Sequence, residues 1–429
     1  MLAVFAWCAT PLHAQSDLGS ITGFVHDPTG AVVPKASVTV KDEATGTERK
    51  VTTNNDGVYT VTNIPSGLYT VTVDITGFKK SQTLHNKLDP NSTLRADVSL
   101  QIGQATEIVE VNASAQTLQT DSASVQKLIS RTQIDALELN GRNPIYLANL
   151  QPGVVKGSPL SGLNFGLDSG GFNINGGRSQ DNLITFDGAP AVRTRSNGTS
   201  IGVADVDSTQ EIQVLTANYA AEYRSASGGQ IRIVSKSGTS QFHGNLFEYF
   251  RNNVLNANSW SRNNNIQTKD VAPFHYNQYG YNIGGPAYIP GVFNKDKNKF
   301  FFFWGQEWLK YHYGDTATLA VPSLAMRQGD FSELLVPGNA FYGSPKIVND
   351  PRTGQPFAGN VIPADRLSPN GIGILNAYPT PNEPFFQGNQ NWLGTGSHTI
   401  DQRKDTLTAD MYPGQSHHIA FRRQNYNYL

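Results

Sequence analysis

Hydrophobic and polar residues alternate with a period of two along residues 20–101, and turn-forming residues interrupt the alternation about every eight to twelve positions. The clearest run covers residues 69–75, where one face carries Tyr69, Val71, Val73 and Ile75 and the other carries Thr70, Thr72 and Asp74. Successive side chains of a strand point to opposite faces, so the first set is predicted to face a core and the second to face water. This pattern is typical of a small β-sandwich, which we place at residues 18–101.

Turn chemistry supports this interpretation. Asp27-Pro28-Thr29-Gly30 combines a side chain that can accept from its own backbone, a proline with a fixed φ and a closing glycine. Residues 55–57 and 65–67 are also turn-forming, and they bracket a predicted strand over residues 58–63.

Residues 102–119 break the alternation. Glu107, Ile108, Val109, Glu110 and Val111 form a short extended segment, and small polar residues follow it. Two interpretations stay open. The segment is an ordinary linker or last strand, or it adds to the sheet edge of a partner protein through main-chain hydrogen bonds.

Residues 120–238 carry a mixed pattern. One or two short helices are predicted within residues 122–139 from the apolar positions Val125, Leu128, Ile129, Ile134 and Leu137. A polar break at residues 140–144 follows, and Asp187-Gly188 is predicted to be a hairpin turn. We therefore expect a mixed α/β domain here.

Beyond residue 239 the chain again predicts strands, at residues 241–252, 279–285, 299–311, 406–411 and 418–426. Aromatic residues crowd the third of these, from Phe300 to Trp304 and again at Trp308, Tyr311 and Tyr313. Such residues cover the lipid face of a membrane barrel or the core of a soluble sandwich, and periodicity does not separate the two. Residues 315–397 are rich in glycine, proline and asparagine, and they are predicted to form a long loop.

Composition agrees with a mostly β fold. The chain has 429 residues with 41 glycines and 23 prolines, and 33 Lys and Arg against 34 Asp and Glu leave a formal charge of -1. A balanced charge argues against a nucleic-acid binder that relies on a basic field.

The first residues predict export. Residues 2–9 are apolar, and Leu12-His13-Ala14 resembles a cleavage site, so residues 1–14 are interpreted as a signal peptide whose basic start is truncated. The single cysteine, Cys8, lies within it, which leaves no disulfide framework. No run of 18 or more apolar residues predicts a membrane-spanning helix.

The motifs of common enzymes are absent from the sequence. There is no His-Glu-x-x-His zinc motif, no Gly-x-x-x-x-Gly-Lys-Ser/Thr loop and no Gly-x-Ser-x-Gly elbow. The sequence therefore predicts no enzyme, with no catalytic residue, no metal site and no cofactor.

Several of these segments resemble known families. Residues 21–25, 56–59 and 64–69 resemble the carboxypeptidase-regulatory-like sandwich domain. Residues 172–178, 184–188, 211–214, 218–223 and 228–238 resemble, as an ordered set, the plug domain of TonB-dependent outer-membrane transporters. Residues 241–252, 326–332 and 349–357 are similar to the Oar-like branch of that family, which carries such a sandwich at its N-terminus.

The resemblance implies a domain order: a sandwich (residues 18–101), a linker with a TonB-box-like segment (102–119), a plug region (120–238) and a barrel region (239–429) whose loop 315–397 faces outward. It implies an outer-membrane location, with the sandwich and plug on the periplasmic side. Expected partners are the TonB inner-membrane complex, which pulls on residues 107–111, and outer-membrane lipid; no nucleic acid and no particular substrate are implied.

The resemblance also implies a set of plug motif residues with a structural or gating role, namely Asn140, Gly141, Arg142, Asn143, Asn175, Gly176, Arg178, Asp187 and Gly188. Arg142 and Arg178 are expected to bond carboxylates or the barrel wall.

The number of strands limits this interpretation. Only four or five strands are predicted after residue 238, whereas bacterial barrels close with about eight or more. We therefore expect an N-terminal fragment of such a transporter. The alternative is an exported surface or periplasmic binding or adhesion module without transport activity.

Overall fold

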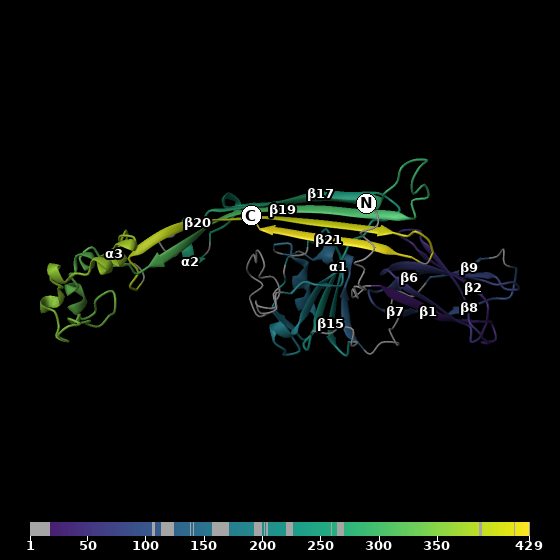
Figure 1. Cartoon of the computed structure of the whole chain (residues 1–429), viewed down its shortest axis with the longest axis horizontal. Coiled ribbons are helices and arrows are strands. Elements are labelled where there is room, and N and C mark those ends of the chain that lie inside the picture. The colour runs from purple at the N-terminus through teal and green to yellow at the C-terminus, as the bar shows by residue number, and fades with distance from the viewer. Residues whose placement is uncertain are drawn as a thin grey trace, which may run out of the picture. The chain divides into compact units, whose positions relative to one another are not determined.

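The computed structural model (Figure 1) describes residues 18–104, 108–112, 124–137, 139, 141–156, 171–192, 200, 202, 205–219, 226–258, 260–263, 270–385, 388–415 and 417–428. The predicted signal peptide with Cys8 lies outside these ranges. The chain divides into two compact units, one of residues up to 248 with 278–308 and 402–429, the other of residues 249–277 and 309–401.

The sandwich has two sheets. One has the order β4-β1-β7, with β8 also paired to β1; the other has the order β3-β2-β5-β6-β9. Their strands are β1 (Gly19–His26), β2 (Ser37–Asp42), β3 (Glu48–Thr52), β4 (Val58–Ile64), β5 (Gly67–Asp74), β6 (Lys80–Leu88), β7 (Thr93–Arg95), β8 (Val98–Ser99) and β9 (Ile108–Asn112). Fully buried side chains of both sheets, such as Ile21, Val25, Val38 and Val71, form one core. The predicted sandwich is confirmed.

The alternation in β5 is confirmed on one face and wrong at one position of the other. Tyr69, Val71 and Val73 are buried as predicted, but Thr70 is buried as well. Its hydroxyl donates to the Glu43 carboxylate at 2.9 Å. A polar side chain can leave water when it is hydrogen-bonded, and the hydrophobic pattern does not reveal that partner.

The plug region contains a five-stranded sheet of order β10-β15-β16-β13-β14 and a separate pair, β11 with β12. Its elements are β10 (Val125–Ile129), α1 (Arg131–Ala136), the 3₁₀ helix η2 (Pro144–Leu150), β11 (Val154–Lys156), β12 (Phe172–Ile174), η3 (Ser179–Asp181), β13 (Leu183–Phe186), β14 (Ala189–Pro190), β15 (Thr209–Ala217) and β16 (Gln230–Ser235). The expected mixed α/β fold is confirmed.

The helix prediction for residues 122–139 is half wrong. Its second half is α1, but its first half is strand β10, which pairs antiparallel with β15 from Val125 to Ile129. Apolar residues at positions i, i+3 and i+4 fit one face of a helix, and a short run of this kind does not exclude a strand. Tertiary pairing with the edge of β15 decides the outcome.

The barrel region forms one sheet of order β17-β18-β19-β20-β21, so β17 and β21 lie at its ends. The strands are β17 (His243–Asn252), β18 (Phe274–Pro286), β19 (Phe300–Leu319), β20 (Trp392–Met411) and β21 (Ile419–Tyr428), with η4 (Asn253–Leu255) and α2 (Trp260–Asn263) between the first two. The long ribbons of β19, β20 and β21 run side by side in Figure 1. The expected four or five strands are thus observed as five.

Three of these strands, β18, β19 and β20, are longer than predicted, and the loop between β19 and β20 is shorter than residues 315–397. β19 continues to Leu319 and β20 begins at Trp392. The added positions include several polar residues, so no apolar alternation marks them. Their backbone groups are nevertheless satisfied by the neighbouring strand, which needs no particular side chain.

The loop itself is folded. It holds η6 (Met326–Gln328), η7 (Ser332–Leu335), η8 (Ala358–Asn360), η9 (Ala364–Arg366) and α3 (Pro369–Ala377). Buried Asn360 ties three segments together, because its amide donates to the carbonyls of Phe331 and Lys346 and its oxygen accepts from the Val348 N–H at 2.7 Å. These hydrogen bonds join segments without regular strands or long helices, which explains the lack of periodicity.

The aromatic cluster divides between the two faces of β19. Phe301 and Phe303 are fully buried, and Phe301 packs edge-on against Tyr412. Phe301 and Phe303 therefore share the buried face of β19, because consecutive residues of a strand point to opposite sides.

Candidate functional site

The predicted partner segment is the edge strand of the sandwich. Ile108, Val109, Glu110 and Val111 lie in β9, which pairs parallel with β6. Glu107 lies outside the described residues, as does Asn140 of the predicted plug motif.

A tight turn positions Arg142. Gly141 and Arg142 both have positive φ, 78° and 49°, so the backbone reverses after α1. Asn143 then caps η2, because its side-chain oxygen accepts from the Ile145 N–H at 3.2 Å, and Pro144 occupies the first helical position. The capped helix fixes the turn, and the Arg142 side chain is directed toward β19.

Arg142 enters a buried ionic network, which we define as Arg142, Asp205, Asp207, Glu307 and Lys404. Its guanidinium bonds the Asp207 carboxylate, and its Nε lies 3.6 Å from Glu307 Oε2. The other Glu307 oxygen lies 2.7 Å from Lys404 Nζ. The side chains of Glu307 and Lys404 are only 1% and 8% exposed, so these charges are removed from water and depend on one another.

Neutral groups of the barrel region complete the surroundings of the network. The Asn245 amide donates to Asp207 Oδ1 at 2.9 Å, and the Phe247 ring lies under the Arg142 guanidinium, 4.7 Å from its centroid. Hydrogen bonds and the face of an aromatic ring stabilise a charge without water, so the network can stay buried.

Asp205 is an acid of the network whose pKa is raised by its surroundings. Burial, and then the negative charge of Glu307, raise the pKa of Asp205 to about 6, although Lys404 and the Ser208 hydroxyl oppose the shift. That hydroxyl donates to Asp205 Oδ2 at 2.7 Å, and the Asp207 N–H donates to Oδ1 at 3.0 Å. The network therefore combines three acids with two bases, and Asp205 takes up a proton more readily than an ordinary aspartate.

The sequence analysis singled out Arg142 and missed the other four residues of the network. Glu307 interrupts the most aromatic strand of the chain, and Asp205 and Asp207 flank a valine just before β15. A charge inside an apolar strand is a usable sign of a buried pair. The cations that Glu307 contacts lie about a hundred or more positions away in the sequence, so local sequence spacing does not reveal them.

Asp187 and Gly188 form the predicted hairpin turn between β13 and β14, with φ values of 47° and 81°. The Asp187 carboxylate accepts from the Ser235 N–H at 2.8 Å and from its hydroxyl at 2.6 Å, and burial raises the pKa of Asp187. This turn is thereby fastened to the last residue of β16, which precedes the barrel region.

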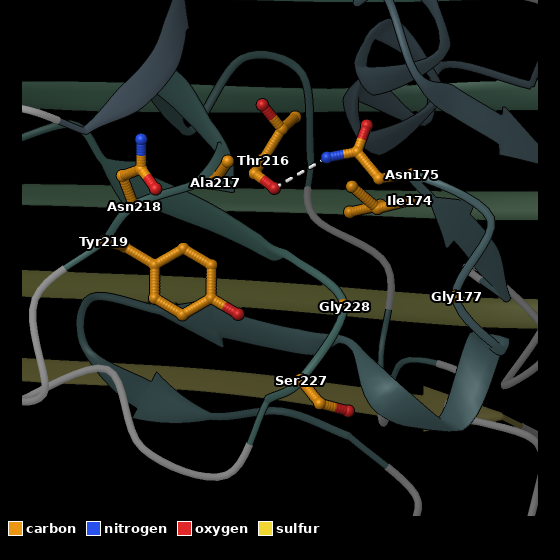
Figure 2. Close-up of a pocket in the computed structure, with 9 residues that line it drawn as sticks. All are labelled: Ile174, Asn175, Gly177, Thr216, Ala217, Asn218, Tyr219, Ser227 and Gly228. Atoms are coloured by element: carbon orange, nitrogen blue, oxygen red, sulfur yellow. Dashed lines mark hydrogen bonds between the residues drawn. The ribbon is translucent and has the colours of Figure 1, made fainter.

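Asn175 and Gly176 lie in a turn beside an open cavity of about 340 Å³ (Figure 2). The Asn175 amide points to the Thr216 carbonyl and donates to it at 2.8 Å. The cavity is lined by Ile174, Asn175, Gly177, Thr216, Ala217, Asn218, Tyr219, Ser227 and Gly228. None of these lining residues carries a charge.

The structure does not bring Arg178 into the ionic network. Arg178 is exposed and precedes η3, where its backbone N–H donates to the Asp181 carboxylate at 3.2 Å. Asp187 and Asn175 also lie apart from Arg142, so the predicted plug motif residues form separate local structures.

The part of the chain that the structure describes contains no group of three or more His, Cys, Asp or Glu side chains that could hold a metal ion. Within the same ranges, no helix is long and apolar enough to cross a membrane.

Three family models match the chain in sequence order. The Carboxypeptidase regulatory-like domain matches residues 20–101, the TonB-dependent Receptor Plug Domain matches residues 117–230, and the Outer membrane beta barrel domain matches residues 234–429. The chain is a relative of the TonB-dependent outer-membrane transporters. The family resemblance and the outer-membrane location expected from the sequence are confirmed.

Individual proteins are similar to parts of the chain. TonB-dependent transporter Oar of Myxococcus xanthus is 25% identical over 279 residues, which cover 63% of this chain and 25% of that protein. The chain thus spans about a quarter of the length of the Oar transporter, the curated protein that it matches. A crystal structure of the ferric enterobactin receptor PfeA matches 72% of this chain and 34% of its own at 15% identity and a TM-score of 0.34. The TIE protein of Bacillus anthracis matches 20% of this chain and 17% of its own at 18% identity and a TM-score of 0.18.

The ionic network of this chain joins two of the matched domains. Arg142, Asp205 and Asp207 lie within the plug match, and Glu307 and Lys404 lie within the barrel match. It is a buried electrostatic contact between these two regions.

Proposed function

We propose that the chain acts in a TonB-dependent outer-membrane transporter, in which the plug region occludes the lumen behind the barrel strands and the ionic network holds it there. Transport then requires the TonB complex to pull on residues 107–111 and loosen this contact. The proposal assigns no catalytic step to the chain, because the energy comes from the partner. We propose the domain boundaries given from the sequence, except that β9 within residues 102–119 belongs to the sandwich sheet.

The observation that carries the proposal is the burial of charge between the plug and barrel regions. A buried ion pair is weak evidence for stability alone, since apolar residues of the same size often stabilise as well. Breaking such a contact, however, exposes charges that water solvates readily. A contact that separates into two hydrated, charged surfaces suits a plug that must leave the wall and return.

The outer face of the barrel strands supports lipid as a partner. On β17, Asn245 and Phe247 point to the ionic network, whereas Leu246 between them is 85% exposed. Ile283 and Phe421 are exposed in the same way on β18 and β21. Apolar residues facing outward and polar residues facing inward are the pattern of membrane strands.

Cysteine labelling in cells tests the proposed plug movement. Ser208 is 3% exposed and adjoins Asp205 in the network, so Ser208→Cys should react with a maleimide only when the plug region leaves the wall. Thr132→Cys, an exposed position on α1, serves as the control, and both are made in a Cys8→Ser background. We expect Ser208→Cys labelling to require TonB and a proton gradient, with Thr132→Cys labelled throughout. Equal labelling of Ser208→Cys with and without TonB would reject the proposal.

The partner segment is tested separately. Val109→Pro removes a main-chain donor from a strand, so we expect it to abolish pull-down of the TonB periplasmic domain, whereas Val109→Thr keeps the donor and should bind as wild type. Unchanged binding by Val109→Pro would place the partner segment elsewhere.

Membrane extraction tests the alternative, an adhesion module. Release of the chain by a salt wash would favour that module, and a requirement for detergent would favour the barrel.

A further inference from the structure

The five-stranded plug sheet buries polar side chains on the face opposite its apolar core. Ile212 and Val214 of β15 lie in that core. Glu211 and Gln213 alternate with them, so they point to the other face, where they are only 6% and 1% exposed. Arg232 of β16 donates to the Gln213 side-chain oxygen at 2.9 Å. Buried polar groups need hydrogen-bond partners and a cover that keeps water out, so this face is not a free surface.

Two turns of the sandwich supply part of this cover. The hydroxyl of Ser66, in the turn between β4 and β5, donates to Glu211 Oε1 at 2.8 Å. The Gln213 amide donates at 3.3 Å to the carbonyl of Pro90, two residues after β6. Pro90 is itself buried. The sandwich therefore contacts the polar face of the plug sheet through specific hydrogen bonds, in addition to its connection along the chain.

A third turn of the sandwich reaches the segment that leads into the barrel strands. The buried Asp42 carboxylate accepts from the Ala44 N–H at 2.8 Å, which shapes the turn after β2. The Ala44 carbonyl accepts from both the N–H and the hydroxyl of Ser240, each at 3.0 Å. Ser240 lies three residues before β17. The sandwich is thus bonded both to the plug sheet and to the start of the barrel region.

We propose that the sandwich is a clamp, which holds the plug region in its closed position by bonding at once to the plug sheet and to the segment before β17. This inference rests on the proposed function, and it adds that the sandwich opposes plug movement. The clamp contacts are hydrogen bonds between polar groups, and water replaces them when the surfaces part. Such a clamp can open and close repeatedly.

A like charge at one contact tests the clamp. Ser66→Glu places a second carboxylate beside Glu211, and the repulsion should part the sandwich from the plug sheet. The reporter is maleimide labelling of Ser208→Cys in a Cys8→Ser background, in cells that lack TonB. We expect Ser66→Glu to raise the labelling rate about tenfold or more, because the open population grows even though the ionic network remains. Ser99→Glu, at an exposed serine of β8, is the matched control and should leave the rate unchanged.

A compensating change separates repulsion from damage to the turn. Glu211→Gln removes one of the two charges, so Ser66→Glu/Glu211→Gln should return labelling to the rate of Ser208→Cys alone. A rate that stays high in this double variant, or an unchanged rate in Ser66→Glu, would overturn the inference. The proposed function would still stand, provided that Ser208→Cys alone is labelled only with TonB. Labelling of Ser208→Cys alone without TonB would instead reject the proposed function.

The contact with the barrel region is tested in the same cells. Ser240→Pro removes both donors to the Ala44 carbonyl, whereas Ser240→Ala removes only the hydroxyl. We expect the labelling rate of Ser208→Cys to rise with Ser240→Ala and to rise further with Ser240→Pro. Equal rates in both variants and in the parent chain would show that this contact does not restrain the plug, and would overturn the clamp.

Discussion

Removing the charge of Glu307 is the sharpest test of the ionic network. Glu307→Gln keeps the size of the side chain but leaves the Lys404 ammonium, 2.7 Å away and 8% exposed, without its anion. Arg142 also loses a neighbour at 3.6 Å, although it retains Asp207. Breaking a buried pair by removing one partner costs about 3–5 kcal/mol, because one charge remains buried and uncompensated.

Urea unfolding of the chain in detergent micelles, followed by tryptophan fluorescence, measures this loss. Trp304 and Trp308 lie on the same strand as Glu307, so they report on the affected region. We expect a stability loss of about 3 kcal/mol or more, equivalent to a change of over a hundredfold in the unfolding equilibrium. Glu307→Gln/Lys404→Met removes one anion and one cation together and should recover most of it.

A second pair on the same two strands provides the matched control. Lys310 and Asp401 lie 3.0 Å apart, but their side chains are 45% and 24% exposed. Asp401→Asn should therefore cost less than about 1 kcal/mol, because exposed pairs are solvated and screened. Equal losses in Glu307→Gln and Asp401→Asn, or no recovery in the double variant, would refute the reasoning.

Three further changes test other parts of the chain. The pKa of Asp205 is about 6 in the folded chain against an unfolded value of about 3.9, so its contribution to stability falls as the pH rises from about 4 to 6. Asp205→Asn should remove this fall. The urea midpoints of the variant and wild type should therefore converge only at low pH. Gly23→Ala would place its Cβ in steric overlap with the Ala96 carbonyl oxygen. We expect the free energy of unfolding in urea to fall by about 1–3 kcal/mol. An unchanged urea midpoint would contradict this expectation. Asn360→Ala leaves three backbone partners without their hydrogen bonds, so limited proteolysis should cut the folded loop faster than in wild type, and an equal rate would contradict its role.

Much of the fold could be predicted from local sequence. The alternation in residues 69–75 predicted which face of β5 is buried, and Asp187-Gly188 predicted a turn that needs positive φ at both positions. These succeed because the cause lies within a few residues. The first half of the 122–139 segment failed, because the same apolar spacing fits a helix and a strand, and only the neighbouring strand β15 decides between them.

The candidate site divides in the same way. The sequence by itself determined the family and the mostly β architecture and singled out Arg142 as a candidate residue, because the motifs, the period-two pattern and the Asn-Gly-Arg-Asn break are local. Only the tertiary structure decided that Arg142 meets Asp207 and Glu307, and that residues 108–112 form β9, the last strand in the order of the larger sandwich sheet. Ion pairs and strand edges join residues distant in sequence, and their energy depends on burial, which exists only once the chain has folded.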